Sequence, residues 1–260
     1  MFVKDTVLFK KERQLKILDI MHQDGSVNVN SLATHFHVTP ATIRADLTRL
    51  EAEGALVRTH GGAIANPTGH RESRIYERHN EEKKNRIAEK ATAFVAERDI
   101  LLLDTGTTMV SFAKALVRSS ITELTVFSND IDVIRILEEK EQFSLHLFAG
   151  KIRNGYHYCY GSQLSQLLHN CHFDKLFLSA CAVSLEHGLT TASPELAQIK
   201  RNMICASDKI ILLADSSKLH QVDFQNFADL QQIDVLIMDS DLTEADSNKL
   251  ESLVEKVVLA

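Results

Sequence analysis

The stretch from Thr39 to Leu50 predicts an amphipathic helix near the start of the chain. Thr39 and Pro40 form a helix start signal, because a threonine hydroxyl caps free backbone N–H groups and proline suits the first helical position. Ile43, Leu47 and Leu50 recur at helical spacing, so they form one apolar stripe that faces a core. This stripe decides which side of the helix is buried and which side is left for other contacts.

The opposite side of the same helix carries small and hydroxyl side chains with two arginines at its edges. These side chains are Ala41, Thr42, Ala45, Thr48, Arg44 and Arg49. Short side chains allow close approach to base edges in a DNA major groove, and guanidinium groups reach guanine edges or phosphates. An ordinary amphipathic surface helix shows the same pattern, so the flanking segments decide between these two interpretations.

The flanking segments predict two more helices and a hairpin. Residues 12–23 have the pattern of a first helix, and Asn30 is expected to cap a second helix after a very short strand. Two short strands surround Gly61-Gly62 after the third helix, and these glycines permit the positive φ of a tight turn. Three helices followed by a hairpin predict a winged helix-turn-helix within residues 1–65.

Side chains outside the third helix complete the predicted DNA-binding face. Arg58 and His60 on the hairpin are placed to contact phosphate or the minor groove, and Thr39 begins the helix that is expected to enter the major groove. Asp46 lies beside the apolar stripe, which favours an internal hydrogen bond or salt bridge. We therefore expect double-stranded DNA as a partner of this domain.

Composition limits the class of protein. The net charge is −6, and residues 1–66 hold 8 lysines and arginines against 7 acidic residues, so DNA affinity must come from a local basic face. No apolar run reaches the length of a membrane span, and charged residues interrupt the first 20 residues, which argues against a signal peptide. The 4 cysteines are scattered and no histidine pair has zinc-ligand spacing with cysteine. We expect a cytoplasmic protein with reduced thiols, without metal, cofactor or membrane partner.

A polar stretch over residues 66–79 predicts a linker before a second domain over residues 80–260. From residue 99 onward, short apolar runs alternate with amphipathic helices, which is typical of a mostly parallel sheet with helices on both sides. The predicted strands, each expected to be buried on both faces, are Ile100–Leu103, Leu124–Phe127, Leu145–Phe148, Lys175–Ser179, Ile210–Ala214 and Val235–Met238. The predicted helices lie near residues 107–117, 130–140, 161–170, 194–206 and 243–255.

A ligand is expected at the carboxyl ends of these strands, where open α/β sheets bind small molecules. Asp104-Thr105-Gly106-Thr107-Thr108 follows one strand directly and opens a helix. Gly106 permits a tight turn, and backbone N–H groups together with the threonine hydroxyls form a cradle for an anion at a positive helix end. The spacing excludes a Walker A loop. A plain strand–helix turn with a threonine cap is the competing interpretation.

Other strand ends supply polar partners for the same ligand. Lys218, Lys200 and Arg153 are candidates to neutralise a phosphate. Asp104 and Asn129 are candidates to bind sugar hydroxyls. Surface solvation explains any one of the lysines by itself, so the prediction depends on the set as a whole.

The N-terminal pattern resembles the DeoR family of bacterial transcriptional regulators. The run from Ser26 to Ala63, SVNVNSLATHFHVTPATIRADLTRLEAEGALVRTHGGA, is similar to the family's signature, although Arg44-Ala45 stands where members commonly have two arginines. The ATIRADL form resembles the branch of regulators that serves galactitol and amino-sugar pathways.

The strand ends resemble the sensor domain of the same family. The family patterns D-[ST]-G-T-T, T-N, G-G-x-x-R and D-S-S-K match Asp104–Thr108, Ser128-Asn129, Ala149-Gly150-Lys151-Ile152-Arg153 and residues 215–218, with departures at Ser128 and Ala149. The resemblance implies a fold similar to ribose-phosphate isomerases and amino-sugar-phosphate deaminases. It also implies effector contacts at these positions, among them Gly150.

We therefore expect a repressor of a carbohydrate operon that is released from operator DNA by a phosphorylated sugar and acts as a homo-oligomer, a dimer or a tetramer. A sugar-phosphate isomerase or deaminase with an accessory DNA-binding domain is the first alternative. Against it, no positioned acid–base pair is evident around Asp104, and no catalytic residue is predicted. An architectural DNA-binding protein whose second domain only oligomerises is the other alternative.

Overall fold

The computed structural model describes residues 10–24, 26–52, 56–59, 61–65, 80–153 and 156–260. The chain divides into two compact units, Met1–Arg71 and Glu72–Ala260. The division falls inside the linker that the sequence predicts. The linker, Gly54 and His60 lie outside the described residues.

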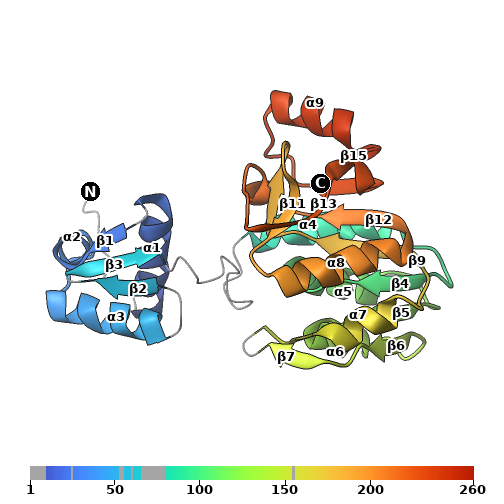
Figure 1. The fold of residues 1–260 in the computed structure, drawn as a ribbon, viewed down its shortest axis with the longest axis horizontal. Helices are drawn as coiled ribbons and strands as arrows, with labels where there is room; N and C mark the ends of the chain where they lie inside the picture. Colours follow the sequence, from blue (N-terminus) through green and yellow to red (C-terminus); the bar gives the residue numbers. More distant parts are fainter. Residues whose placement is uncertain (1–9, 25, 53–55, 60, 66–79, 154–155) are drawn as a thin grey trace. The chain divides into compact units, whose positions relative to one another are not determined.

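The first unit contains helices followed by a hairpin, in the order expected for a winged helix-turn-helix (Figure 1). Its elements are α1 (Lys10–Asp24), β1 (Ser26–Asn28), α2 (Val29–His35), α3 (Pro40–Ala52), β2 (Leu56–Thr59) and β3 (Gly62–Ala65). The strands form an antiparallel sheet in the order β1-β3-β2. A side chain at Gly62 would come within 2.0 Å of the Val27 carbonyl oxygen, so the close pairing of β1 and β3 requires glycine there.

The predicted apolar stripe of α3 is confirmed as the centre of this unit's core. Ile43, Leu47 and Leu50 are buried and belong to one apolar cluster with side chains of α1, α2 and β2. The predicted cap of α2 is wrong, because Asn28 and not Asn30 holds that position. The Asn28 side chain accepts hydrogen bonds from the backbone N–H groups of Asn30 and Ser31.

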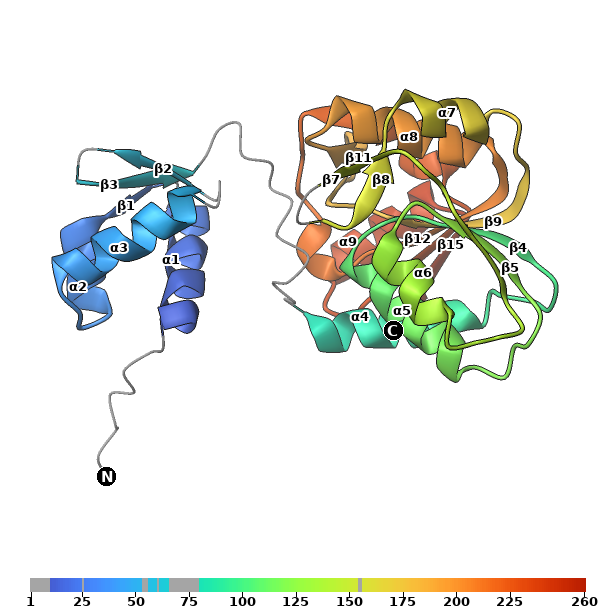
Figure 2. The same ribbon diagram turned by 90° about the horizontal axis from the view of Figure 1, so that it is seen from below.

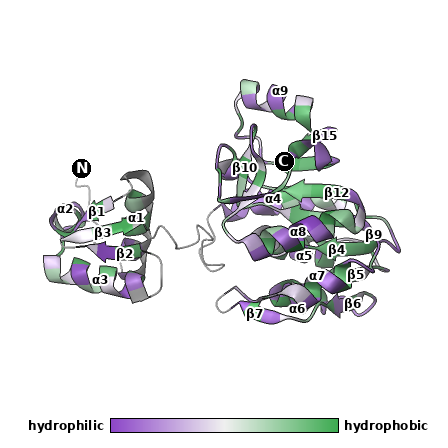
Figure 3. Ribbon diagram, in the orientation of Figure 1, coloured by the Kyte–Doolittle hydropathy of each residue, from purple (hydrophilic) through white to green (hydrophobic). Residues whose placement is uncertain are grey.

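The second unit is built on a seven-stranded parallel sheet in the order β15-β14-β12-β9-β4-β5-β6. Its strands are β4 (Ile100–Leu103), β5 (Thr125–Ser128), β6 (Ser144–Leu147), β9 (Phe173–Ser179), β12 (Ser207–Leu213), β14 (Val235–Met238) and β15 (Lys256–Leu259). The apolar residues gather on these central strands (Figure 3). The mostly parallel sheet predicted from the alternating pattern is confirmed.

Helices cover both faces of this sheet (Figure 2). Neighbouring residues of one strand point into opposite apolar clusters, as period-two geometry requires: Leu101 and Leu103 face one cluster and Leu102 the other. The helices that contribute to the first cluster are α4 (Glu81–Thr92), α5 (Thr107–Arg118) and α6 (Ile131–Leu137). Those that contribute to the second are α7 (Ser162–Leu168), α8 (Pro194–Cys205) and α9 (Glu244–Leu253).

The edges of the sheet differ from the prediction. Leu147 in β6 is 45% exposed and Leu259 in β15 is 43% exposed, so these strands are not buried on both faces. Each pairs with one neighbour only within the described sheet, and no helix covers them fully. The predicted helix 243–255 extends too far, since α9 ends at Leu253 and β15 follows.

Five short strands outside the main sheet escaped prediction because each spans only three or four residues. β7 (Lys151–Arg153) and β8 (Tyr158–Tyr160) form an antiparallel pair, and a separate sheet has the order β10-β11-β13. The strands of that sheet are β10 (Ala182–Ser184), β11 (Gly188–Thr191) and β13 (Gln225–Ala228). Among the helices of the described residues, none is long and apolar enough to cross a membrane.

Candidate functional site

The outer side of α3 is open to solvent, as the predicted DNA-reading face requires. Thr39, Ala41, Arg44 and Arg49 are exposed, and Thr42 is half-buried. The Thr39 hydroxyl accepts a hydrogen bond from the Thr42 N–H at 3.2 Å, which confirms Thr39 as the helix cap. Small side chains therefore leave the start of this helix accessible.

The hairpin contacts the same face through Arg58. The Arg58 guanidinium donates a hydrogen bond to the Thr48 hydroxyl at 3.0 Å, and that hydroxyl donates to the Arg44 carbonyl at 2.8 Å. Thr48 and Arg58 thus hold the hairpin against the helix. The side chain of Arg44 forms no hydrogen bond with another described residue, so its guanidinium is available for an external partner.

Asp46 has the internal role that its position beside the stripe predicts. Its carboxylate is buried and accepts hydrogen bonds from Arg13 Nε at 2.7 Å and Gln14 Nε2 at 2.8 Å. Both partners lie on α1, so this ion pair fastens the first helix to α3. The ion pair therefore fixes the position of α3, whose outer side is open to solvent.

The loop between β4 and α5 has only part of the geometry that an anion cradle requires. Gly106 adopts a φ of 107°, and α5 begins without a side-chain cap. The Gly106 N–H, however, donates to the Asp130 carboxylate at 3.0 Å, so it is not available to a ligand. The N–H groups of the first turn of α5, at Thr107 and Thr108, remain for an anion.

Asp104 is fully buried at the end of β4. One carboxylate oxygen accepts hydrogen bonds from the backbone N–H and the hydroxyl of Ser179, at 2.9 and 2.8 Å, and forms an ion pair with Lys200. The Ser179 hydroxyl also lies 2.8 Å from the Thr105 carbonyl oxygen. Lys200, predicted as a phosphate contact, therefore already has Asp104 as a buried partner of opposite charge.

Buried polar atoms at the strand ends lack partners. Among the described residues, the side-chain atoms in this state are Asp104 Oδ1, Asn129 Oδ1 and Thr191 Oγ1. The Asn129 amide nitrogen donates to the Cys159 carbonyl at 2.8 Å, which leaves its oxygen as an acceptor. Buried polar groups are hydrogen-bonded in most proteins, so unpaired ones mark a place where a polar ligand fits.

The predicted residues of the β7–β8 hairpin have local contacts. A side chain at Gly150 would come within 2.6 Å of the Tyr160 carbonyl oxygen, so glycine is required for the backbone to approach there. The Arg153 guanidinium lies 4.4 Å from the centre of the Tyr156 ring and donates to the Tyr158 hydroxyl at 2.6 Å. Arg153 is therefore held by aromatic side chains of its own hairpin.

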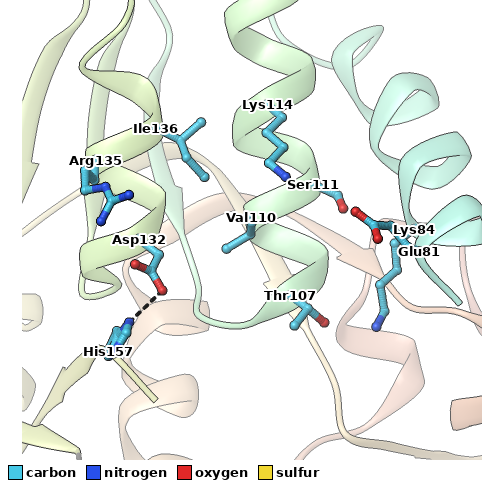
Figure 4. A pocket seen from close by; sticks show the side chains of 10 residues that line it. All are labelled: Glu81, Lys84, Thr107, Val110, Ser111, Lys114, Asp132, Arg135, Ile136 and His157. Atoms are coloured by element: carbon cyan, nitrogen blue, oxygen red, sulfur yellow. Dashed lines mark hydrogen bonds and ion pairs between the residues drawn. The ribbon is translucent and has the colours of Figure 1, made fainter. Parts of the chain in front are cut away.

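A cavity of about 340 Å³ lies beside the start of α5, and its lining includes Lys84, Lys114 and Arg135 (Figure 4). Its walls come from α4, α5 and α6, and His157 on its rim forms an ion pair with Asp132 at 2.9 Å. The lining residues are Glu81, Lys84, Thr107, Val110, Ser111, Lys114, Asp132, Arg135, Ile136 and His157.

Lys84 lines this cavity but is not among the site residues that the sequence predicts. Its side chain is only 7% exposed, and burial lowers the pKa of its ammonium group, although the charge of Asp215 opposes this effect. Lys218, in the 3₁₀ turn Ser216–Lys218, is near enough to lower the same pKa further. A signal was present in the sequence, because Lys84 falls on the stripe of Ile87 and Ala91 that faces the core.

Asp130 connects the loop to the next helix. Its carboxylate caps α6 by accepting the N–H groups of Asp132 and Val133, and also accepts the N–H of Gly106. Burial raises the pKa of the Asp130 carboxyl to about 6, against the lowering effect of these three N–H groups. The loop that follows β4 and the start of α6 are thus held by one side chain.

A winged helix-turn-helix joined to an α/β unit with polar atoms at its strand ends defines a class, the ligand-responsive DNA-binding regulators. Comparison with known families agrees with this class. Residues 13–68 match the DeoR-like helix-turn-helix domain, and residues 79–240 match the DeoR C-terminal sensor domain. The chain therefore belongs to the DeoR family of transcriptional regulators.

Individual relatives align along nearly the whole chain. The HTH-type transcriptional repressor GlcR of Bacillus subtilis is 34% identical, over 89% of each chain. The putative aga operon transcriptional repressor of Escherichia coli O157:H7 is 33% identical, over 88% of this chain and 86% of that protein. Among solved structures, ribose 5-phosphate isomerase A from Neisseria gonorrhoeae aligns with a TM-score of 0.39 and 20% identity, over 52% of each chain.

Proposed function

We propose that this regulator represses a carbohydrate-utilisation operon and leaves its operator when a phosphorylated sugar binds the second unit. The observation that carries the proposal is the set of unpaired buried atoms on Asp104, Asn129 and Thr191. Carboxylate and amide oxygens accept hydrogen bonds from sugar hydroxyls, and a buried unpaired acceptor gains the most from such a partner. The relatives that are named as repressors support the regulatory part of the proposal.

The phosphate belongs at the start of α5. The positive end of that helix has no side-chain cap, and its first-turn N–H groups suit an anion. Lys84 and Lys218 supply positive charge from α4 and from the turn after β12. Thr105, Thr107 and Thr108 contribute hydroxyls at the same loop. Lys200 is paired with Asp104, so we assign the phosphate to Lys84 and Lys218.

The DNA contacts belong to the outer side of α3 and the hairpin. Thr39, Ala41, Thr42 and Arg44 are the candidates for base edges in the major groove, because they lie at the exposed start of the helix. Arg49 and Arg58, with Thr48 and His60, are the candidates for phosphate contacts. A single α3 reads few base pairs, so the regulator acts on its operator as a homo-oligomer, a dimer or a tetramer.

The chain is not an enzyme under this proposal. A general base needs a carboxylate that is able to take a proton from the substrate. Asp104 is neutralised by Lys200, and Asp130 uses both oxygens to accept backbone N–H groups. Incubation with sugar phosphates should therefore give no isomerised or deaminated product.

The test of the proposal is release from DNA. Operator DNA is selected from a random pool with the full chain, and its affinity is measured with and without phosphorylated hexoses, hexitols and amino sugars. We expect one class of these compounds to weaken operator binding about 5–150-fold, the range of a typical allosteric coupling. Binding of a panel member is recorded separately by thermal shift. If no member of the panel binds or changes operator affinity, the effector part of the proposal is wrong.

A further inference from the structure

The first turn of α4 is tied to the turn that carries Lys218. Asn80, directly before α4, has a left-handed backbone with a φ of 60°. Its side-chain amide donates to Asp215 Oδ1 at 3.0 Å and to the Ser217 hydroxyl at 3.3 Å. These partners lie more than half the chain away in sequence, so the contact exists only in the folded unit.

Lys83 makes a second connection between the same segments. Its ammonium donates to the Ser216 hydroxyl at 2.9 Å and forms ion pairs with Asp239 at 2.9 Å and Asp241 at 2.7 Å. These partners, Asp241 foremost, raise the pKa of Lys83 although burial opposes them. Asp239 is fully buried and also accepts the N–H and the hydroxyl of Ser216, at 2.6 and 2.9 Å. The turn and the helix start are therefore joined through shared acceptors.

The position of Asn80 shows that its side chain serves this connection and not its own helix. A residue at the start of a helix usually turns its side chain to the first N–H groups of that helix. Asn80 makes no such bond, and its side chain reaches the Asp215–Lys218 turn. We refer to this set of contacts as the clamp, formed by Asn80, Lys83, Asp215, Ser216, Ser217 and Asp239.

We propose that the clamp transmits effector binding from the Asp215–Lys218 turn to the chain at residue 80, where the segment from the DNA-binding unit enters the second unit. The inference rests on the proposed function, because it takes Lys218 and Lys84 as contacts of the phosphate. Each of these lysines lies beside a clamp residue, Lys218 next to Ser217 and Lys84 next to Lys83. An anion that draws the two lysines together moves both halves of the clamp.

A clamp of this kind separates binding from response. Asn80→Gly removes both side-chain hydrogen bonds but keeps a residue that adopts positive φ without strain. Lys83→Met removes the ion pairs and keeps the length of the side chain. Neither residue carries one of the unpaired strand-end atoms. The sugar phosphate should therefore still bind both variants.

The experiment uses the full chain and the panel of phosphorylated hexoses, hexitols and amino sugars. For wild type, Asn80→Gly, Lys83→Met and the control Lys90→Met, effector binding is followed by thermal shift and operator affinity is measured with and without the panel member. We expect a wild-type response of about 5–150-fold to fall to about onefold in the two clamp variants, with binding retained. Lys90 is exposed on the same helix, so its variant should respond as wild type does.

The other outcomes overturn the inference in distinguishable ways. If both clamp variants respond with the wild-type ratio, the clamp does not transmit the signal, and the proposed function stands. If they no longer bind any panel member, the clamp residues belong to the effector site itself and the transmission role is wrong. If the wild type neither binds nor responds, the proposed function fails and the inference fails with it. The separate Asn80 and Lys83 substitutions keep the test decisive should one of them not fold.

Discussion

At the scale of single residues, buried ion pairs hold the structure, and other charged residues are the proposed contacts of partners. Lys200 and Asp104 neutralise each other in the interior, and Asp46 does the same for Arg13. The side chain of Arg44 is exposed on α3 and forms no hydrogen bond with another described residue, and Lys84 is buried at the wall of a cavity. Substitution of Arg44 or Lys84 should therefore change binding and not folding.

Arg44→Ala should weaken specific operator binding by about 1–3 kcal/mol, because a bidentate arginine contact to a base edge has that value. The fold should be unaffected, since Arg44 is exposed and its side chain forms no hydrogen bond with another described residue. The measurement is gel-shift titration against operator and scrambled DNA at one salt concentration. Arg98→Ala is the matched control, as that arginine is exposed in the second unit and forms an ion pair with the exposed Glu123. An unchanged ratio of specific to non-specific affinity would remove Arg44 from base readout.

Lys84→Met should weaken sugar phosphate binding about 10–100-fold, the equivalent of a hydrogen bond to a charged group. Lys218→Ala should abolish the effector response and leave DNA binding without effector nearly intact. Lys84→Met should not lower thermal stability, because burial already disfavours the charged ammonium. Calorimetric titration with the active panel member, alongside Lys90→Met, tests the affinity. Wild-type affinity in both Lys84→Met and Lys218→Ala would show that the phosphate lies elsewhere.

At the scale of elements, two carboxylates connect segments that the sequence separates. Asp46 joins α3 to α1, and Asp130 joins the loop after β4 to the start of α6. Asp46 accepts hydrogen bonds from two residues of α1, and Asp130 accepts them from both the loop and α6. The recognition face and the effector loop are therefore both positioned by a neighbouring element.

Asp46→Ala should lower the stability of the DNA-binding unit by about 3 kcal/mol, because it leaves Arg13 without its buried partner. Asp46→Asn should lose less, since it keeps one acceptor for Gln14. Chemical unfolding of the full chain, followed by a probe in the first unit, gives the two free energies. Equal stability of wild type and Asp46→Ala would show that this ion pair contributes nothing to the fold.

Asp130 should make the second unit more stable in mild acid. Its folded-state pKa is about 6, above the ordinary aspartate value of 3.8, so the folded state binds the proton more tightly than the unfolded state. This stabilisation is complete below about pH 4 and is lost as the pH rises through about 6, a change of about 3 kcal/mol. Asp130→Asn should therefore lose less stability than wild type between about pH 5 and pH 7.5 in urea unfolding. Parallel curves for the two proteins would contradict the raised pKa.

At the scale of the whole molecule, a chain with net charge −6 must bind DNA through a small face. One α3 offers contacts to a few base pairs only, so we expect at least two copies of the chain to read an operator of useful length. The second unit offers the exposed strand edges of its sheet, including Leu147 and Leu259, for association.

The full chain should sediment as at least a dimer at micromolar concentration, and its operator should hold two half-sites about one helical turn or a multiple of it apart. The physical reason is that dimerisation doubles the number of base contacts with one loss of rotational freedom. Sedimentation velocity and footprinting measure the two properties. A strict monomer that binds a single site with full affinity would contradict this prediction.

Local sequence patterns were sufficient for the central elements of this protein, but not for β15 or the five short strands outside the main sheet. The bounds of β4 and β14, the stripe of α3, the Asp104–Thr108 loop and the parallel sheet all follow from periodicity and turn chemistry over short windows. Such windows carry information because backbone dihedral preferences and one-sided burial depend on near neighbours. The resemblance to the DeoR family was readable for the same reason, since its motifs are short and contiguous.

Only the tertiary structure decided which charged groups remain for a ligand. Lys200 was indistinguishable in sequence from Lys218, yet it pairs with Asp104, 96 positions away in the chain. The Asn80 side chain reaches Asp215, 135 positions away. The strand β15 follows the predicted helix and was not predicted, because only its pairing with β14 defines it. The physical reason is that ion pairs, hydrogen bonds and strand pairing depend on segments that meet only after the chain has folded.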